Sequence, residues 1–428
     1  DDVGIIDLVS SLVDKSLFVA DIHEAGPRYR LLEPIRQFAR EKLEQLGETQ
    51  GALERHAQVY ATIARDGYEE WDTNPSRDWL ARLENELANF RAALSWTIGE
   101  GNDLVCGASI AGDTAPVFLR LSLLSEGSQW CERALGEGAS LGAAIEARLR
   151  YVLSMLYNNQ GATKNALAQT LEAASLYRQA GDDRGLARAL SQVANQRAHE
   201  NQLGDARSAA EEALALAREI GDPRLLADVL RRCARSFLTD GAGRVRGMLA
   251  ESVAIYRSLG RDDDTARALT WLGQFEAEAG NYEEAAERLN EAKPFADDEL
   301  LVSVVGELAG CYLVTGDRAK AAPAAREALA LAAKSRQAME ILFAISYVAA
   351  IAGECNATEA AALIGYAEER LRAAGWQRVA YDIAIVESLE ETLKGRLGDR
   401  ELAQLFAAGA AMGEEEAVAR ATALTSSF

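Results

Sequence analysis

Apolar residues recur at helical spacing through most of the chain, and short turn segments interrupt them at regular intervals. The clearest case is residues 267–292, where Leu269 and Leu272 lie on one face of a predicted helix. Gly280 then breaks the pattern, and a second amphipathic run begins at Tyr282. This stretch predicts two helices joined by a tight turn.

Small residues occupy the positions where these two helices would touch. Gly273 lies in the first helix, and Ala285 and Ala292 lie in the second. Small side chains allow two helix backbones to approach closely while the larger neighbours interdigitate. We therefore expect a closely packed helical hairpin.

The same spacing recurs along the chain, with a small residue seven positions before each turn residue and others five and twelve positions after it. Successive turns are separated by 39, 40, 39, 40, 36 and 37 positions, a period typical of helical-hairpin solenoids. Val245 is the only member of the small set larger than Thr or Cys. The predicted turn residues are Ser122, Gly161, Asn201, Asp240, Gly280, Gly316 and Gly353.

The segments W-L-G and G-N-Y, with the alanines that follow them in 271–292, resemble a tetratricopeptide repeat (TPR) that is slightly longer than the usual unit. The resemblance covers roughly residues 100–375. It implies an all-α fold, a TPR-like right-handed α-solenoid of about seven helix hairpins.

The N-terminal part shows a different pattern. Residues 3–13 predict a short helix, and 17–20 and 28–32 alternate like two strands of a hairpin. Another helix should begin at Pro34 and end before Gly47. A helix, a β-wing and a helix form the second half of a winged-helix domain.

The amino-acid sequence of this region resembles that of bacterial STAND-class regulators. These are signal-transducing ATPases built from a nucleotide domain, a winged helix and a TPR sensor. The similar segments are L-V-D-K-S-L-F-V at 12–19, R-Y-R-L-L-E-P-I-R-Q-F-A-R-E-K-L at 28–43, and further stretches at 79–96 and 124–135. The resemblance implies that a nucleotide-binding domain for ATP or ADP precedes Asp1, with a DNA-binding output domain at one end of many such regulators. We therefore expect this chain to be a fragment.

These patterns predict four regions. Residues 1–48 would be the C-terminal part of the winged-helix domain, 49–99 connecting helices, 100–375 the solenoid, and 376–428 a C-terminal helical cap. Solenoids need such caps because a terminal repeat otherwise exposes its apolar face. Among the connecting helices, 72–75 predicts a turn, with Ser76 as the N-cap of the next helix.

Charge and cysteine usage limit the class of protein. Of the 428 residues, 49% are hydrophobic, and the chain carries a net charge of -21. This negative charge argues against binding to the phosphate backbone of a nucleic acid. The most basic part is the wing, with Arg28, Arg30, Arg36 and Arg40, and DNA contact there is an alternative. Five dispersed cysteines without a C-x-x-C pair, and the lack of a signal peptide or membrane-length apolar run, predict a reducing cytoplasm.

We find no motif for catalysis in the sequence. No G-x-x-x-x-G-K-[ST] loop occurs, and the glycine-rich stretch 241–247 follows a predicted helix and fits a turn. The three histidines lie on separate elements without metal spacing. We expect this fragment to be neither an enzyme nor a metal or cofactor binder.

The remaining prediction concerns binding of a partner. The TPR resemblance implies that the first helix of each hairpin lines a concave groove for a protein, peptide or small effector. The arginine that recurs at one repeat position favours an acidic ligand. Alternatively, these arginines pair with neighbouring glutamates. The predicted groove residues are Arg148, Tyr151, Asn159, Arg188, Asn195, His199, Arg267 and Gln274.

The sequence thus predicts a regulatory, non-catalytic sensor region of a STAND-type transcriptional regulator, which would control its nucleotide-binding domain. Two alternatives stay open: a constitutive TPR scaffold, and the sensor arm of a signalling kinase or cyclase.

Overall fold

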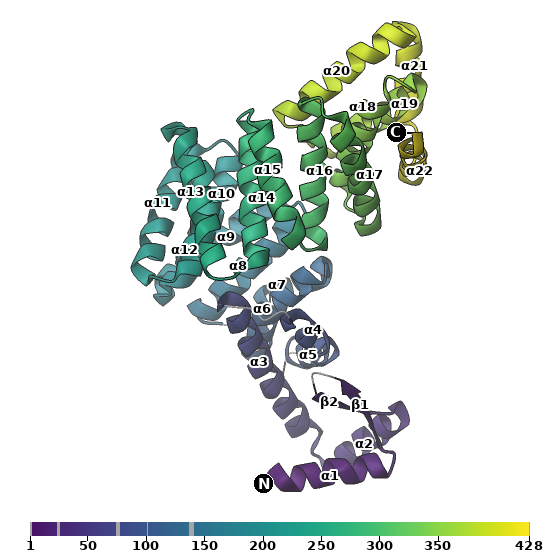
Figure 1. Ribbon diagram of the computed structural model, residues 1–428. Coiled ribbons are helices and arrows are strands. Elements are labelled where there is room, and N and C mark those ends of the chain that lie inside the picture. Colours follow the sequence, from purple (N-terminus) through teal and green to yellow (C-terminus); the bar gives the residue numbers. More distant parts are fainter. Residues whose placement is uncertain (1, 24–25, 74–77, 101, 137–140, 428) are drawn as a thin grey trace. The chain divides into compact units, whose positions relative to one another are not determined.

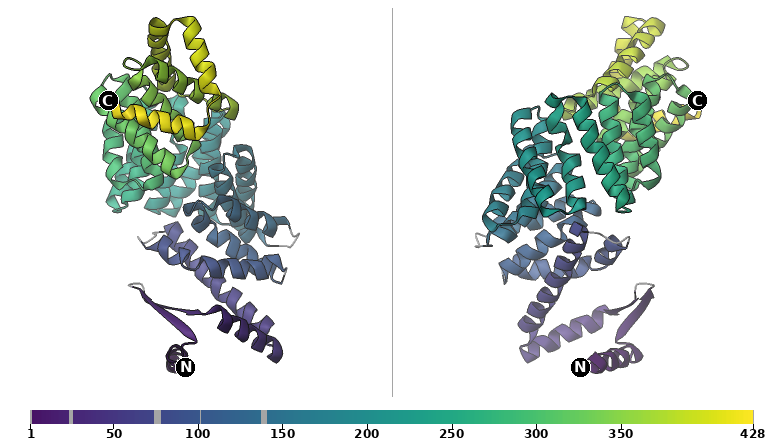
Figure 2. Two further views of the ribbon diagram at one scale, coloured as in Figure 1. Left: turned by 90° about the vertical axis from the view of Figure 1, so that its right-hand side faces the viewer. Right: turned by 60° about the vertical axis from the view of Figure 1, so that its left-hand side comes forward.

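The computed structural model describes residues 2–23, 26–73, 78–100, 102–136 and 141–427 (Figure 1). The chain divides into two compact units, Asp1–Gln196 and Arg197–Phe428. Both consist mainly of consecutive antiparallel helices, and Figure 2 shows these helices from two further sides. The all-α, TPR-like fold class predicted from the repeats is confirmed.

The first unit begins with a helix, a hairpin and a helix, as predicted. The strands pair in antiparallel register, with Phe18 opposite Leu31 and Ala20 opposite Tyr29. They extend further toward the turn than the sequence pattern indicated. The elements are α1 (Asp2–Asp14), β1 (Phe18–His23), β2 (Gly26–Leu31) and α2 (Glu33–Leu46).

Gly47 ends α2 in a left-handed conformation with φ 70°, and its N–H donates to the carbonyl of Glu44 at 3.1 Å. Glycine adopts this conformation without the steric cost of a Cβ. The next helix, α3, continues through Thr73, so the first two residues of the predicted turn at 72–75 are helical, and 74–75 lie outside the described residues. Ser76 lies outside the described residues.

Helix α3 packs against α5 and α6, α6 packs against α7 and α8, and α8 packs against α7 and α9. The remaining elements are α3 (Thr49–Thr73), α4 (Trp79–Glu84), α5 (Leu87–Leu94), the π-helical turn η1 (Ser95–Gly99), α6 (Leu104–Arg120), α7 (Leu124–Gly136), α8 (Ala143–Asn159), α9 (Thr163–Ala180) and α10 (Asp183–His199).

The second unit continues the helical hairpins to the C-terminus. Its longer helices are α11 (Leu203–Ile220), α12 (Pro223–Cys233), α13 (Ala242–Ser258), α14 (Asp262–Glu278), α15 (Tyr282–Ala292), α16 (Asp298–Val314), α17 (Arg318–Ser335), α18 (Ala338–Ala352), α19 (Ala357–Ala374), α20 (Ala380–Leu397), α21 (Asp399–Ala410) and α22 (Glu414–Leu424). The short 3₁₀ turns are η2 (Ala234–Asp240), η3 (Lys293–Phe295) and η4 (Thr425–Ser427).

Five of the seven predicted turn residues adopt the left-handed conformation that reverses the chain after a helix. They are Ser122, Gly161, Asn201, Gly280 and Gly316. At the fourth turn the left-handed residue is Gly241, with φ 99°, and not Asp240. These turns start the second helix of each hairpin where the period places it.

The last predicted turn is present between α18 and α19, but Gly353 does not adopt the left-handed conformation there. Gly353 keeps a right-handed conformation with φ -53°, and its N–H donates to the carbonyl of Ala349 at 2.9 Å. The turn comprises residues 353–355, and the Asn356 side chain then accepts from the N–H of Glu359 and caps α19. Thr358 consequently lies in the first turn of α19 and is exposed. Every other residue of the predicted small set is buried.

The close approach predicted between α14 and α15 is present. A Cβ atom on Gly273 would lie 2.8 Å from the Cγ of Leu289 and 3.3 Å from the carbonyl oxygen of Ala285. Ala285 and Ala292 have no exposed surface. No side chain beyond hydrogen fits at Gly273 without movement of its neighbours.

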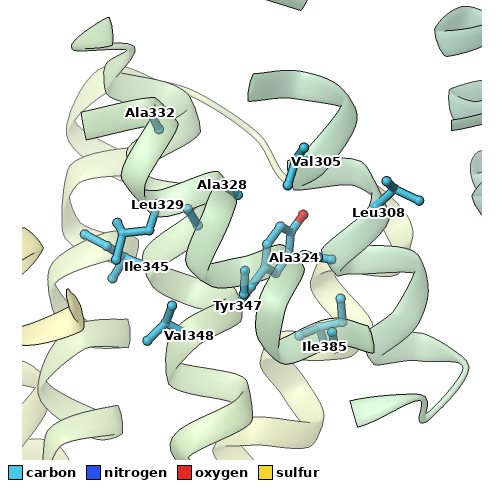
Figure 3. Close-up of a cluster of buried hydrophobic side chains, with 14 of the residues drawn as sticks. Val305, Leu308, Ala324, Ala328, Leu329, Ala332, Ile345, Tyr347, Val348 and Ile385 are labelled. Carbon is cyan, nitrogen blue, oxygen red and sulfur yellow. The ribbon is translucent and has the colours of Figure 1, made fainter. Parts of the chain in front are cut away.

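Alternating small and large side chains fill the core of the second unit (Figure 3). Small residues of α17 pack against larger ones of α16 and α18, and α20 packs on α16 and α18, so the helices interdigitate. Members of this core are Val305, Leu308, Ala324, Ala328, Leu329, Ala332, Ile345, Tyr347, Val348 and Ile385.

Candidate functional site

A pocket of about 680 Å³ opens in the first unit, where the C-terminal end of α3 meets α8, the end of α9 and the start of α10. Its lining combines three arginines, two tyrosines and several carboxylates. The lining residues are Asp66, Tyr68, Glu69, Glu70, Asp72, Thr73, Arg148, Tyr177, Asp182, Arg184, Gly185 and Arg188.

Arg148 joins two walls of this pocket. Its Nη1 donates to the Oδ1 of Asp113 at 2.6 Å, and its guanidinium carbon lies 4.6 Å from the centre of the Tyr68 ring. Asp113 is only 4% exposed, and burial raises its pKa while the charge of Arg148 lowers it. The half-buried Arg148 is therefore held in place by an anion and an aromatic face.

Asp72, at the end of α3, forms ion pairs with two further arginines. Its Oδ2 accepts from the Nε of Arg184 at 2.9 Å, and its Oδ1 pairs with the Nη1 of Arg188. The backbone carbonyl of Asp72 also accepts from the Nη2 of Arg188 at 2.9 Å. These contacts connect α3 with α10 across more than a hundred residues of sequence.

The aromatic part of the pocket depends on a glycine. A Cβ on Gly185 would overlap the ring of Tyr177, so glycine is what allows the ring to lie over the start of α10. Tyr177 packs edge-to-face on Tyr151, with ring centres 6.4 Å apart. Burial raises the pKa of Tyr68 to about 12, so this tyrosine stays neutral and acts as a polar, aromatic surface.

The structure brings three of the predicted groove residues together here. Arg148 and Arg188 line the pocket, and Tyr151 lies beneath Tyr177 with 3% of its surface exposed. Asn159 is exposed at the other end of α8, and its Nδ2 donates to the Met155 carbonyl at 3.0 Å.

The other predicted groove residues lie elsewhere. Asn195 is half-buried on α10, with no hydrogen-bond partner for its Oδ1. The other three belong to the second unit. His199 is exposed, Arg267 donates to Asp297 at 2.6 Å, and Gln274 donates to Glu307 at 3.4 Å.

Arg148, Arg188 and Arg267 thus each form an ion pair with an acidic side chain, as the alternative interpretation of the repeated arginine predicted. The partners are aspartates on other elements, whereas neighbouring glutamates were expected. The other pocket residues, Asp72, Tyr68, Tyr177 and Arg184, were not predicted. Asp72 and Tyr68 belong to a connecting helix outside the repeats, and no periodic signal marks them.

The second unit holds a separate polar cluster between α14, α16, α18 and α20. Glu307 accepts from the hydroxyl of Tyr381, and Asp382 accepts from the hydroxyl of Tyr347 at 2.6 Å. Burial raises the pKa of Glu307 to about 7 and that of Asp382 to about 6. In the described part of the chain no group of histidine, cysteine and acidic residues has metal-binding geometry. None of the helices searched there is long and apolar enough to cross a membrane.

Helical hairpins with this period and these small contact residues define a TPR-like repeat protein. No family model matches the chain. It is 29% identical over 318 residues to proteins named HTH-type transcriptional regulators from Mycobacterium bovis and from two strains of Mycobacterium tuberculosis. The matched region is 72% of this chain and 35% of those proteins, so the chain spans about a third of the length of the relatives it matches.

Two solved structures are similar in fold. A STAND protein with a tetratricopeptide repeat sensor from Pyrococcus horikoshii matches 94% of this chain and 57% of its own, with a TM-score of 0.57 and 16% identity. A Rap protein in complex with Competence and Sporulation Factor matches 86% of this chain and 99% of its own, with the same TM-score and identity. The resemblance found in the sequence is confirmed by these similarities.

Proposed function

We propose that this chain is the sensor region of a STAND-type transcriptional regulator, which binds an effector in the pocket at the end of α3 and controls a nucleotide-binding domain for ATP or ADP. The observation that carries the proposal is that the fold is similar to that of a STAND protein with a TPR sensor over 94% of this chain. The sequence similarity to HTH-type regulators supports a role in transcription.

The pocket supports the sensing role. It is large enough for several side chains of a peptide or for a small metabolite, and charged and aromatic groups converge in it. The structurally similar Rap protein is complexed with Competence and Sporulation Factor, which supports a ligand-binding role for this fold. A non-catalytic role fits a site made of paired arginines and neutral tyrosines.

Exposed apolar side chains on α1 and α2 are consistent with contact between these helices and another domain. In α1, Ile5, Ile6 and Leu8 are each exposed by 60% or more, and in α2, Phe38 and Leu46 are exposed by 58% and 69%. Exposed apolar side chains clustered on short helices are typical of surfaces that another protein surface covers. We assign this surface to the nucleotide-binding domain.

A ligand screen tests the sensing role. The 428-residue protein is screened by thermal shift against metabolites and short peptides, and each hit is repeated with Arg148→Glu and Arg188→Glu. A ligand at 100 times its Kd stabilises the folded protein by about 2.7 kcal/mol, and we expect both variants to lose most of this gain.

Arg318→Glu is the matched control, because Arg318 of α17 also forms an ion pair with an acidic side chain, Glu354, but lies in the second unit. Loss of binding in this control as well, or unchanged binding in the two pocket variants, contradicts the proposed site. In the intact regulator, ATP binding that is unaffected by deletion of this region would contradict the proposed control.

A further inference from the structure

Helix α3 makes different contacts at its middle and at its C-terminal end. Near its middle, the Tyr60 hydroxyl donates to the Oε2 of Glu86 at 3.2 Å, and the Oε1 of Glu86 accepts from Arg28 of the β-hairpin at 2.7 Å. Arg28 also donates to the carbonyl of Asn85 at 2.8 Å. These bonds attach the hairpin to α3 and to the start of α5.

At its C-terminal end, α3 carries Tyr68 and Asp72 into the pocket. Tyr60 and Asp72 are twelve residues apart, which corresponds to about 18 Å along a helix. Helix α3 is continuous between them and packs along α6. A continuous helix moves as a unit, so a displacement of the pocket end reaches the hairpin end.

Asp72 forms ion pairs with the two arginines, Arg184 and Arg188, that an acidic effector would bind. The side chains of Asp72 and Arg188 are each 12% exposed, and Arg184 is 27% exposed. A carboxylate between two guanidinium groups is the arrangement with which arginines recognise acidic ligands. Here the chain supplies that carboxylate itself, from the end of α3.

We propose that Asp72 is a built-in occupant of the Arg184–Arg188 site, and that an anionic group of the effector displaces it and thereby shifts α3 and the hairpin contact through Glu86. This inference rests on the proposed function, because it describes how binding in the same pocket is transmitted. It also defines the effector as carrying a carboxylate or another anion. Binding of the effector and displacement of Asp72 with α3 then affect each other to the same extent.

Hydrogen exchange on the 428-residue protein tests the transmission. Asp72→Asn removes the internal anion. We expect about fivefold faster amide exchange at residues 65–73 and also at 26–31 and 85–90, where the hairpin is attached. Asp66→Asn is the matched control, because Asp66 lines the same pocket on α3 but pairs only with Arg65 on the surface among the contacts described.

Faster exchange confined to residues 65–73, or no change at all, overturns the transmission. Glu86→Gln tests the same coupling from the hairpin end, and it also decides the question if Asp72→Asn does not fold. Because coupling is reciprocal, Glu86→Gln should accelerate exchange at residues 65–73. Unchanged exchange there contradicts the inference.

Calorimetric titration with succinate, a small dicarboxylate, tests the displacement. Without the competing aspartate, the Asp72→Asn protein should bind succinate at least about fivefold more tightly than the unmodified protein at matched ionic strength. Equal affinity, or no binding by Asp72→Asn at millimolar succinate, overturns the displacement. These outcomes are independent of the effector screen: an effector that binds equally to both proteins would leave the proposed function intact and remove only this inference.

Discussion

Two helical glycines in the second unit have opposite surroundings. A Cβ on Gly273 would press on Leu289 and on the backbone of α15, whereas a Cβ on Gly247 of α13 would meet no atom within 4 Å. We expect Gly273→Ala to destabilise the protein by about 1–3 kcal/mol, because the two helices must separate. Denaturant unfolding of the 428-residue protein measures this change.

Gly247→Ala is the control for this prediction. Gly247 is exposed inside a helix, where alanine is favoured over glycine by about 0.5–1 kcal/mol. The two identical substitutions should therefore have opposite signs. Destabilisation of similar size by both would show that backbone conformation and not helix contact determines the cost at Gly273.

The contrast between these glycines explains which residues the sequence could predict. Gly273 belongs to a pattern repeated at fixed offsets, and nearly all members of that pattern are buried. Gly353 and Thr358 follow the same count, but the asparagine cap at Asn356, three residues after Gly353, sets where α19 begins. Local capping overrides the period there, and a count of positions does not detect it.

At the scale of elements, helix packing creates groups of charges that no single helix reveals. Glu307 of α16 faces Tyr381 and Asp382 of α20, with Glu340 of α18 nearby. Likewise, Asp72 and Arg188 are 116 positions apart and meet only because α3 packs beside the repeats. The sequence indicated the helices on which Arg148 and Arg188 lie, but their acidic partners come from outside the repeat pattern or from a different offset.

The pKa of Glu307 predicts a pH dependence for the second unit. Its folded-state pKa is about 7, against an ordinary value of 4.5, chiefly because of burial, while the Tyr381 hydroxyl opposes the rise. The folded protein then binds more protons than the unfolded chain between pH 4.5 and 7. The contribution of Glu307 to stability is therefore present below pH 4.5 and is lost as the pH rises through 7.

Glu307→Gln tests this dependence, because glutamine stays neutral and can still accept from Tyr381. We expect the stability of the variant relative to the unmodified protein to increase by about 1–3 kcal/mol between pH 5 and pH 8. Denaturant unfolding across this range measures the difference. Glu354→Gln, at an exposed ion pair with Arg318, should show no such trend. A flat difference for Glu307→Gln would mean that its carboxyl titrates as an exposed group does.

At the scale of the whole molecule, charge determines whether this chain binds DNA by itself. Its net charge is -21, and in the β-hairpin and α2 Arg28 pairs with Glu86 and Arg36 pairs with Glu33. Affinity for duplex DNA depends on clustered cations that release counterions from the phosphates.

We expect no retardation of a DNA duplex by the 428-residue protein at 50 mM salt, with any Kd weaker than about 10⁻⁴ M. Glu86→Gln releases Arg28 from its ion pair and should leave this result unchanged, since the surrounding negative charge still repels the duplex. Micromolar binding that weakens steeply with salt would instead assign DNA contact to the hairpin, and a regulator that includes this chain would then not need a separate domain for it.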